Sequence, residues 1–168
     1  GYSRPVYSSD GALAGEVGDG NRKDVREAVE AAYKAEAWGK TTAHNRAQII
    51  YYIAENLEAR AAEFCDRIAL TTGRSKRNAT KEVAASIDRL FTYGAWADKY
   101  DGRVHGTPLR NVTVAMNEPI GVMAIVCPDA YPLLSFVSLV FASFAMGNRV
   151  VVIPSAAHPL AATDLYQV

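Results

Sequence analysis

Apolar residues recur at helical spacing through residues 21–100 and predict a run of amphipathic helices. The predicted helices span about residues 21–39, 43–70 and 78–99. Asn21 is a favoured N-cap, and Asp24 stands three residues later, where its side chain can complete a capping box. Gly73 suits a left-handed stop after the second helix. The charged residues fall mostly on the opposite side of each helix, which predicts a solvated face.

Two other segments carry the signals of short strands. An Asp-Gly pair at positions 10–11 lies between short extended runs and predicts a hairpin over about residues 4–17. Apolar and polar residues alternate from 112 to 117, and this period of two predicts a half-buried strand within residues 103–118. Pro108 lacks a backbone N–H, so we expect the upstream part of that segment to be an edge or a turn.

The last third of the chain reads strand, helix, strand, helix. Continuous apolar runs at 121–127 and 149–153 predict two parallel strands that are covered on both faces. Between them, residues 132–146 predict a helix that is apolar nearly all round, and another helix begins near Pro159. Two strands alone make a poor sheet, so the sequence looks truncated. We expect further strands and helices after Val168 in the parent protein.

Composition and charge narrow the class of protein. Apolar residues make up 49% and charged residues 21%, which is typical of a globular chain and excludes disorder. Basic and acidic residues number 18 each, so the absence of a basic excess argues against a nucleic-acid partner. The longest apolar run, residues 133–146, is too short to span a bilayer, and no segment resembles a signal peptide. We therefore expect a cytoplasmic protein with no membrane partner.

The reactive residue types give no independent active-site motif. Cys65 and Cys127 share no CxxC spacing, and we interpret both as reduced, structural thiols. The three histidines lie far apart in the sequence without metal-ligand spacing, so no metal site is predicted. Ser155 is not framed by a Gly-x-Ser-x-Gly turn, and no glycine-rich phosphate loop follows either apolar strand.

An ordered set of motifs resembles the aldehyde dehydrogenase superfamily. Residues 117–122, Asn-Glu-Pro-Ile-Gly-Val, resemble its Glu-Pro-x-Gly-Val strand entry. Residues 128–132, Pro-Asp-Ala-Tyr-Pro, stand at its Pro-Trp-Asn-Phe-Pro turn. Residues 147–156 match the spacing of its Gly-Asn-x-Val-Val-x-Lys-Pro-Ser-Glu run. Upstream positions such as Trp38 and Arg46 also resemble the family, so the likeness covers almost the whole chain.

The resemblance implies an α/β fold that forms the N-terminal portion of the aldehyde dehydrogenase fold. A parallel Rossmann-like sheet with packed helices is accompanied by a small antiparallel oligomerisation element. The resemblance assigns residues 1–20 and 103–118 to oligomerisation-type strands, 21–100 to N-terminal helices, and 119–168 to the truncated start of the cofactor-binding sheet. It also implies NAD or NADP as cofactor, and a homo-oligomer or the remainder of a larger dehydrogenase chain as partner.

The sequence departs from the family at its functional positions. Ala130 stands where the family's Asn donates to the oxyanion, and the loss of one such donor costs about 3 kcal/mol of transition-state stabilisation. Asp129 replaces the preceding Trp with a carboxylate, which disfavours an anionic dinucleotide. Ile153 and Ala156 stand where the family's Lys and Glu bind the adenosine ribose. The family positions that line the cofactor are Val126, Cys127, Pro128, Asp129, Ile153, Pro154, Ser155 and Ala156.

These departures predict a chain with no catalytic residue of its own. The family nucleophile comes later than Val168, so Cys127 is expected to be structural. Structural positions are kept while functional ones are lost, as in the non-catalytic second domain of the two-domain aldehyde dehydrogenases. The favoured hypothesis is an inert structural or assembly domain. Two alternatives stay open: a truncated piece of an active NAD(P)-dependent enzyme that oxidises aldehydes to carboxylic acids, and a non-enzymatic interaction module.

Overall fold

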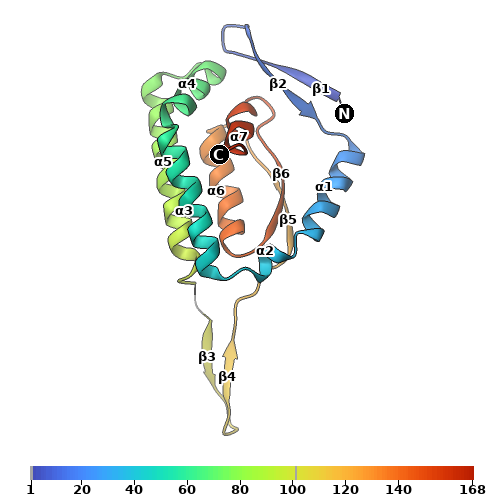
Figure 1. The fold of residues 1–168 in the computed structure, drawn as a ribbon, viewed down its shortest axis with the longest axis vertical. Coiled ribbons are helices and arrows are strands. Elements are labelled where there is room, and N and C mark those ends of the chain that lie inside the picture. Colours follow the sequence, from blue (N-terminus) through green and yellow to red (C-terminus); the bar gives the residue numbers. More distant parts are fainter. Residues whose placement is uncertain (1, 101) are drawn as a thin grey trace.

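The computed structural model describes residues 2–100 and 102–168 and combines a helical layer, a parallel strand pair and two antiparallel hairpins (Figure 1). The helices are α1 (Arg22–Lys34), α2 (Ala37–Lys40), α3 (Ala43–Ala59), α4 (Ala61–Thr72), α5 (Lys76–Ala97), α6 (Pro132–Ala145) and α7 (Leu160–Leu165). The strands are β1 (Tyr2–Tyr7), β2 (Leu13–Asp19), β3 (Arg103–Gly106), β4 (Val112–Ala115), β5 (Val122–Val126) and β6 (Arg149–Ile153). The predicted α/β class is confirmed; position 1 of the predicted 1–20 segment lies outside the described residues.

The two apolar strands pair in parallel, as their sequence predicts. Val122 lies opposite Arg149, and Val126 lies opposite Ile153. Helix α1 contacts one side of the pair and α6 contacts the other (Figure 1). Both faces are therefore covered, which explains why the strands are apolar runs rather than alternating ones.

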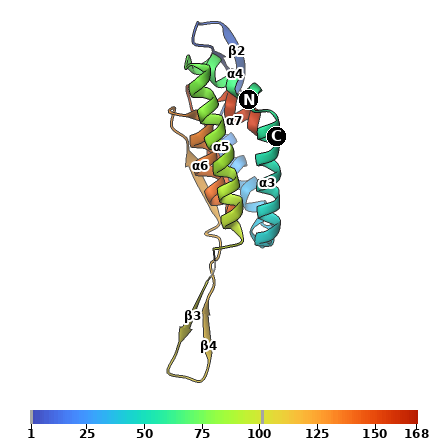
Figure 2. The ribbon, with the colours of Figure 1, turned by 90° about the vertical axis from the view of Figure 1, so that its left-hand side faces the viewer.

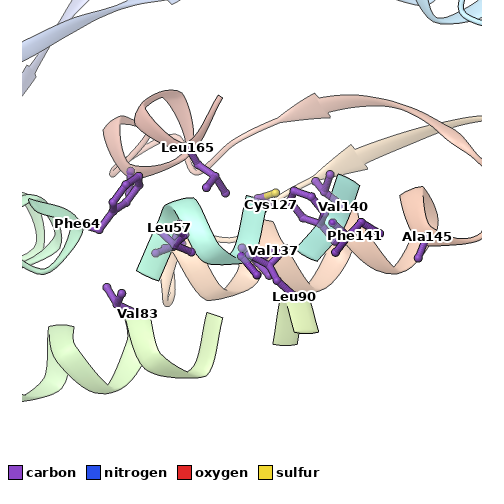
Figure 3. Close-up of a cluster of buried hydrophobic side chains, with 14 of the residues drawn as sticks. Leu57, Phe64, Val83, Leu90, Cys127, Val137, Val140, Phe141, Ala145 and Leu165 are labelled. Atoms are coloured by element: carbon purple, nitrogen blue, oxygen red, sulfur yellow. The ribbon is translucent and has the colours of Figure 1, made fainter. Parts of the chain in front are cut away.

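The hydrophobic core lies between α3, α4 and α5 on one side and α6 with the strand pair on the other (Figure 3). Its fully buried members include Ile50, Leu57, Phe64, Val83, Leu90, Leu133 and Val137. Figure 3 shows side chains of these helices and of α7 converging on one cluster, which also contains Cys127. The all-round apolar character of α6 follows from this central position, because helices and strands cover it on several sides.

Polar anchors hold the N-terminal helices to the C-terminal end of α6. The Trp38 indole donates to the Phe144 carbonyl at 3.0 Å and stacks on the Phe144 ring at a centroid distance of 3.8 Å. Arg46 Nε donates to the Ala145 carbonyl at 2.9 Å. The last carbonyls of a helix lack partners within the helix, so these donors satisfy groups that the core would otherwise bury unpaired.

The helix boundaries predicted from the sequence are partly wrong. The single helix expected over 43–70 is two helices, because the backbone leaves helical geometry at Arg60 with φ −104° and ψ 14°. Arg60 then pairs with Glu63 in the first turn of α4, at 2.7 Å between Nη2 and Oε1. An acidic side chain is favourable in a first turn, so this pair stabilises a new start. The first helix ends at Lys34 rather than at 38–39, and a short α2 follows.

The predicted caps are confirmed. Asn21 Oδ1 accepts from the Lys23 amide at 2.8 Å, and the Asp24 carboxylate accepts from the Asn21 amide at 2.9 Å. Gly73 ends α4 in the left-handed region, at φ 70°. Both features follow from chemistry within a few residues, which is why the sequence alone predicts them.

The predicted hairpin and strand signals have different outcomes. β1 and β2 form the expected antiparallel hairpin, with Gly11 at φ 86° in its turn. β3 and β4 form a second hairpin that projects from the body of the molecule, and we call it the arm (Figure 2). The half-burial predicted for β4 is wrong for this chain, because every residue of both arm strands is exposed. Pro108 lies in the connection between them, as its turn interpretation predicts.

Within residues 2–100 and 102–168, the structure has no helix that is both long enough and apolar enough to cross a membrane.

Candidate functional site

The turn after β5 and the loop after β6 lie next to each other at the carboxyl ends of the parallel strands. We call residues 127–131 and 154–159 together the carboxyl edge. The Cys127 amide donates to the Ile153 carbonyl at 2.9 Å, so the ladder continues up to this edge. Open α/β sheets bind ligands outside the carboxyl ends of their strands. The structure therefore brings together the two groups of positions that the resemblance assigns to the cofactor.

One carboxylate joins the two halves of the carboxyl edge. Asp129 Oδ1 accepts from Ser155 Oγ at 2.7 Å and from the Ala157 amide at 3.0 Å. Hydrogen bonds from the Ala157 backbone and the Ser155 hydroxyl hold the pKa of Asp129 below its ordinary value. The Asp129 carboxylate is therefore ionised at neutral pH. The Ser155 hydroxyl and the Ala157 amide, which donate across the edge, are already hydrogen-bonded to it.

Ser155, Asp129 and His158 lie close together but do not form a nucleophilic triad. In such a triad the imidazole lies between the hydroxyl and the carboxylate. Here Ser155 Oγ donates directly to Asp129, and His158 contributes its backbone amide to Ser155 Oγ at 2.9 Å. Ser155 is also only 2% exposed. The cluster is a loop-fixing network, in agreement with the absence of a nucleophile motif in the sequence.

Cys127 is a buried thiol at this edge, 5% exposed. Desolvation raises the pKa of the Cys127 thiol, so less thiolate is present at neutral pH. The thiolate is the nucleophilic form, and Cys127 is therefore poorly suited to attack a carbonyl. The structure places it as the sequence predicts, in the core.

Alkylation of Cys127 by iodoacetamide is expected to be slow in the native protein at pH 7. The pKa of the Cys127 thiol is higher in the folded than in the unfolded protein. Its burial as a neutral thiol therefore stabilises the fold at pH values below the ordinary thiol pKa. The stabilisation is lost as the pH rises through that value towards the folded pKa. Peptide mass spectrometry after timed alkylation, with the urea-unfolded protein as control, measures the rate. Native alkylation at the unfolded rate would contradict the assignment.

The other assigned positions, Val126, Pro128, Ala130, Ile153, Pro154 and Ala156, offer no polar side chain. Ile153 is 53% exposed at the end of β6, and Ala156 is exposed in the loop that follows. Ala130 is exposed in the first turn, where its carbonyl accepts from Ser135 Oγ at 2.6 Å. Ala130, Ile153 and Ala156 are exposed, so a ligand at the edge would meet methyl and sec-butyl groups instead of hydrogen-bonding side chains.

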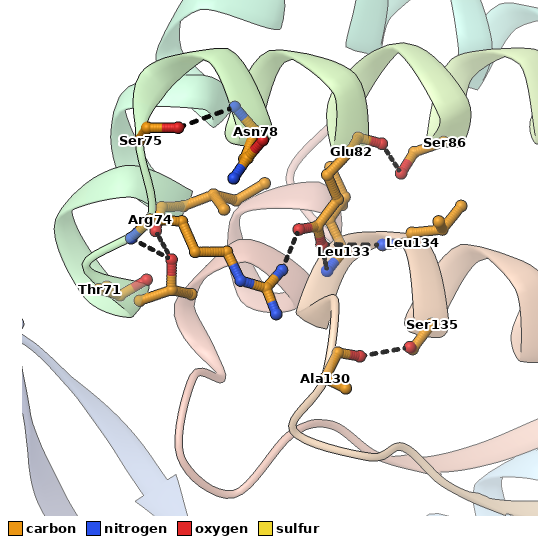
Figure 4. A network of polar contacts seen from close by, with 12 residues as sticks. Thr71, Arg74, Ser75, Asn78, Glu82, Ser86, Ala130, Leu133, Leu134 and Ser135 are labelled. Carbon is orange, nitrogen blue, oxygen red and sulfur yellow. Dashed lines mark hydrogen bonds and ion pairs between the residues drawn. The ribbon is translucent and has the colours of Figure 1, made fainter.

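Sequence reasoning missed a buried ionic network beside the first turn (Figure 4). Glu82 on α5 is 3% exposed and accepts from the Leu133 amide at 3.0 Å and the Leu134 amide at 3.3 Å. Its second oxygen lies 3.1 Å from Nη1 of Arg74. The Arg74 guanidinium in turn lies over the Tyr131 ring, 4.3 Å from the centroid. The network fixes both the start of α6 and the turn that carries Ala130.

A sequence signal for this network does exist. Ala79, Glu82, Val83, Ser86 and Leu90 are all buried and follow the i, i+3, i+4 rhythm of one helical face. A glutamate within such an apolar stripe indicates a buried and partnered carboxylate, because unpaired buried charge is costly. The other charged residues of α5 are exposed, so Glu82 is not distinguished from them by charge alone.

An apolar groove of about 590 Å³ lies beside β6, between α3, α6 and α7. Its lining includes Ile53, Phe136, Phe144, Val150, Val152 and Leu165. Among the residues that the structure describes, no group of three or more histidine, cysteine or acidic side chains is arranged to hold a metal ion. The groove is a packing surface in character, since almost all of its lining is aliphatic or aromatic.

Comparison with known proteins decides the family. The model of the aldehyde dehydrogenase family matches residues 4–168. The chain belongs to the aldehyde dehydrogenase family. Human cytosolic 10-formyltetrahydrofolate dehydrogenase is 32% identical over 168 residues, covering 95% of this chain and 19% of that protein. An aldehyde dehydrogenase of Agaricus bisporus is 31% identical over 161 residues, covering 94% of this chain and 32% of its own length. This chain thus spans about a fifth to a third of these relatives.

Solved structures give the same fold. PnpE in complex with nicotinamide adenine dinucleotide matches with a TM-score of 0.95 at 27% identity, covering 99% of this chain and 35% of that one. Betaine aldehyde dehydrogenase from Staphylococcus aureus in complex with NAD+ matches with a TM-score of 0.93 at 22% identity, covering 98% and 34%. The aldehyde dehydrogenase fold is therefore confirmed, and both of these structures are complexes with nicotinamide adenine dinucleotide.

The side chains at the carboxyl edge of this aldehyde dehydrogenase family chain do not fit a dinucleotide. Ile153 and Ala156 offer neither charge nor a hydrogen-bonding group to a ribose. Asp129 adds a negative charge where an anionic cofactor would approach, and it occupies the donors of Ser155 and Ala157. Like charges repel, and bonded donors are not free to bind a phosphate.

Proposed function

We propose that this chain is a catalytically inert, structural part of a larger aldehyde dehydrogenase family protein and that it does not bind NAD or NADP itself. The observation that carries this proposal is the Asp129 bridge across the carboxyl edge, beside Ile153 and Ala156. The Ser155 hydroxyl and the Ala157 amide already donate to the Asp129 carboxylate and are not free to bind a cofactor. We also propose that the chain lies in the cytosol, as the name of the human cytosolic 10-formyltetrahydrofolate dehydrogenase states for that relative.

The missing chemistry supports inertness. Aldehyde oxidation by this family needs a thiolate nucleophile, an oxyanion donor, a hydride acceptor and a base for the water step. Ala130 supplies no side-chain donor, and Cys127 is buried with a raised pKa. A complete site would need residues from elsewhere in the parent protein. We therefore assign activity to another part of the protein, as in family members that carry two dehydrogenase-like domains in one chain.

The unpartnered apolar surfaces support a role in assembly. Val104, Val112, Val114 and Met116 are exposed on the arm. Alternation along β4 puts Val112 and Val114 on one side, and Val104 on β3 lies opposite Val114. Beside β6, the apolar groove leaves aromatic and aliphatic side chains accessible. Large apolar patches with no cover mark interaction sites. We propose that residues 103–118 and 1–20 act as oligomerisation-type strands, and that the rest of the parent protein covers the groove.

A cofactor titration of the parent protein tests inertness. The variant Ile153→Asp adds a negative charge where an adenosine ribose would lie in relatives. Calorimetry should give the same NAD+ stoichiometry and Kd for Ile153→Asp and for the unmodified parent, because this edge takes no cofactor. A lower stoichiometry or a weaker Kd in the variant would instead favour the first alternative, a piece of an active NAD(P)-dependent aldehyde dehydrogenase.

The arm supplies a second test. Val114→Asp puts a charge on the apolar side of the arm, whereas Thr113→Asp puts the same charge on its other side. The oligomeric mass of the parent, measured by light scattering, is expected to fall in Val114→Asp and to stay unchanged in Thr113→Asp. Unchanged assembly in both would contradict the role of the arm. A stable complex with an unrelated protein, insensitive to NAD+, would favour the second alternative, an interaction module.

The intact mass of the purified parent tests the placement as a second domain. A parent with two dehydrogenase-like domains in one chain agrees with the proposal. A parent with a single such domain contradicts it, because no separate domain would then supply the missing catalytic groups.

A further inference from the structure

We propose that Asp129 is an internal clasp, which joins the two loops of the carboxyl edge and must open before any ligand can lie between them. The clasp consists of the Asp129 carboxylate with the Ser155 hydroxyl and the Ala157 amide. This inference deepens the proposed function, since it names the contact that closes the edge. It does not depend on whether a cofactor binds.

The geometry of the clasp is that of a bridge between separate segments. Asp129 comes from the turn after β5, and both of its donors come from the loop after β6. The two bonds meet on one oxygen, at 2.7 and 3.0 Å. Charge-assisted bonds of this length are among the stronger hydrogen bonds in proteins. A molecule that passes between the loops has to separate this oxygen from both donors.

The second loop is also held by a residue of β1. Arg4 on β1 donates from Nη2 to the Ala156 carbonyl at 2.6 Å. Within the loop, the His158 amide donates to Ser155 Oγ at 2.9 Å. Three consecutive residues, 155 to 157, are thus tied to Asp129 or to β1. A loop held at three successive positions does not open by a local rotation alone, so the clasp bonds have to break together.

Hydrogen exchange of the full-length parent protein tests the clasp without a ligand. Asp129→Ala removes the acceptor, and the Ala157 amide should then exchange roughly tenfold faster or more. Asp129→Asn is the matched control, because its side-chain oxygen can still accept both bonds without the charge; its exchange should stay nearer the wild-type rate. Ser155→Ala should deprotect the His158 amide while Ala157 keeps its bond to Asp129.

Several outcomes would overturn the clasp. Unchanged Ala157 exchange in Asp129→Ala, equal acceleration in the alanine and asparagine variants, or faster exchange spread over α3 as well would each do so. The first means that the bond is not made, the second that the charge and not the two hydrogen bonds holds the loop, and the third that Asp129 supports the whole fold and does not simply join these two loops. NAD+ added to the wild-type parent tests the proposed function separately. Protection of residues 153–157 by NAD+ would defeat that function, while the clasp would stand if the variants behave as stated.

Discussion

Replacing Glu82 with alanine is expected to lower the free energy of unfolding by about 3 kcal/mol or more. The change leaves the Leu133 and Leu134 amides at the start of α6 without their acceptor, and it removes the ion-pair partner of Arg74. Both amides are part of the first turn of a central helix, where water cannot readily replace the carboxylate. Urea denaturation followed by circular dichroism, with the chain variants compared at equal ionic strength, measures the loss.

Two control variants sharpen this test. Glu82→Gln keeps one acceptor for the α6 amides and loses only the charge opposite Arg74, so its loss should be smaller than that of Glu82→Ala. Glu58→Ala, on an exposed position of α3, should change the free energy by less than about 0.5 kcal/mol. A loss in Glu82→Ala no larger than in Glu58→Ala would show that the buried network contributes little to stability.

Replacing Phe64 with alanine is expected to cost about 3–5 kcal/mol of unfolding free energy. Phe64 is 1% exposed and lies in the core on α4, the helix that packs against α5 and α7 (Figure 3). Its ring also lies under the Arg60 guanidinium, 5.6 Å from the centroid, at the break between α3 and α4. The truncation leaves a cavity and removes the contact that directs α4 into the core. Differential scanning calorimetry gives the fall in Tm and the unfolding enthalpy.

The matched control for this variant is Tyr52→Ala, on the exposed side of α3. It also removes an aromatic ring from a helix, but that ring makes no core contact, so its effect should stay within about 0.5 kcal/mol. Similar losses in the two variants would mean that ring removal, and not the burial of Phe64, determines the effect.

Features that depend on neighbouring residues could be predicted from the sequence. The Asn21 and Asp24 capping box, the left-handed Gly73 and the two apolar strands all follow from local chemistry or from continuous patterns. The break at Arg60 could not be predicted, because the apolar positions of α3 and α4 keep a helical rhythm across it. The period of the apolar residues shows which side of a helix faces the core. It does not show whether the helix continues unbroken along one axis.

Contacts between distant segments of the chain could not be predicted from the sequence. Glu82 meets Arg74 and the start of α6 only after the helices pack, and Asp129 meets Ser155 only because parallel strands end side by side. The sequence predicted that a carboxylate at 129 disfavours an anionic cofactor, but not that it would bind the neighbouring loop. The exposure of β4 was likewise hidden, since alternation shows an apolar face without showing what covers it.

Hydrogen exchange of the full-length parent protein, with and without saturating NAD+, shows whether the carboxyl edge binds the cofactor. Peptides that cover residues 126–131 and 153–158 report on the carboxyl edge itself, whatever the rest of the protein binds. We expect the same exchange rates at this edge in both conditions, because the positions assigned to the cofactor lack the groups to hold it. Slower exchange in both peptides on addition of NAD+ would show that this chain keeps a cofactor site and is not the inert domain that we propose.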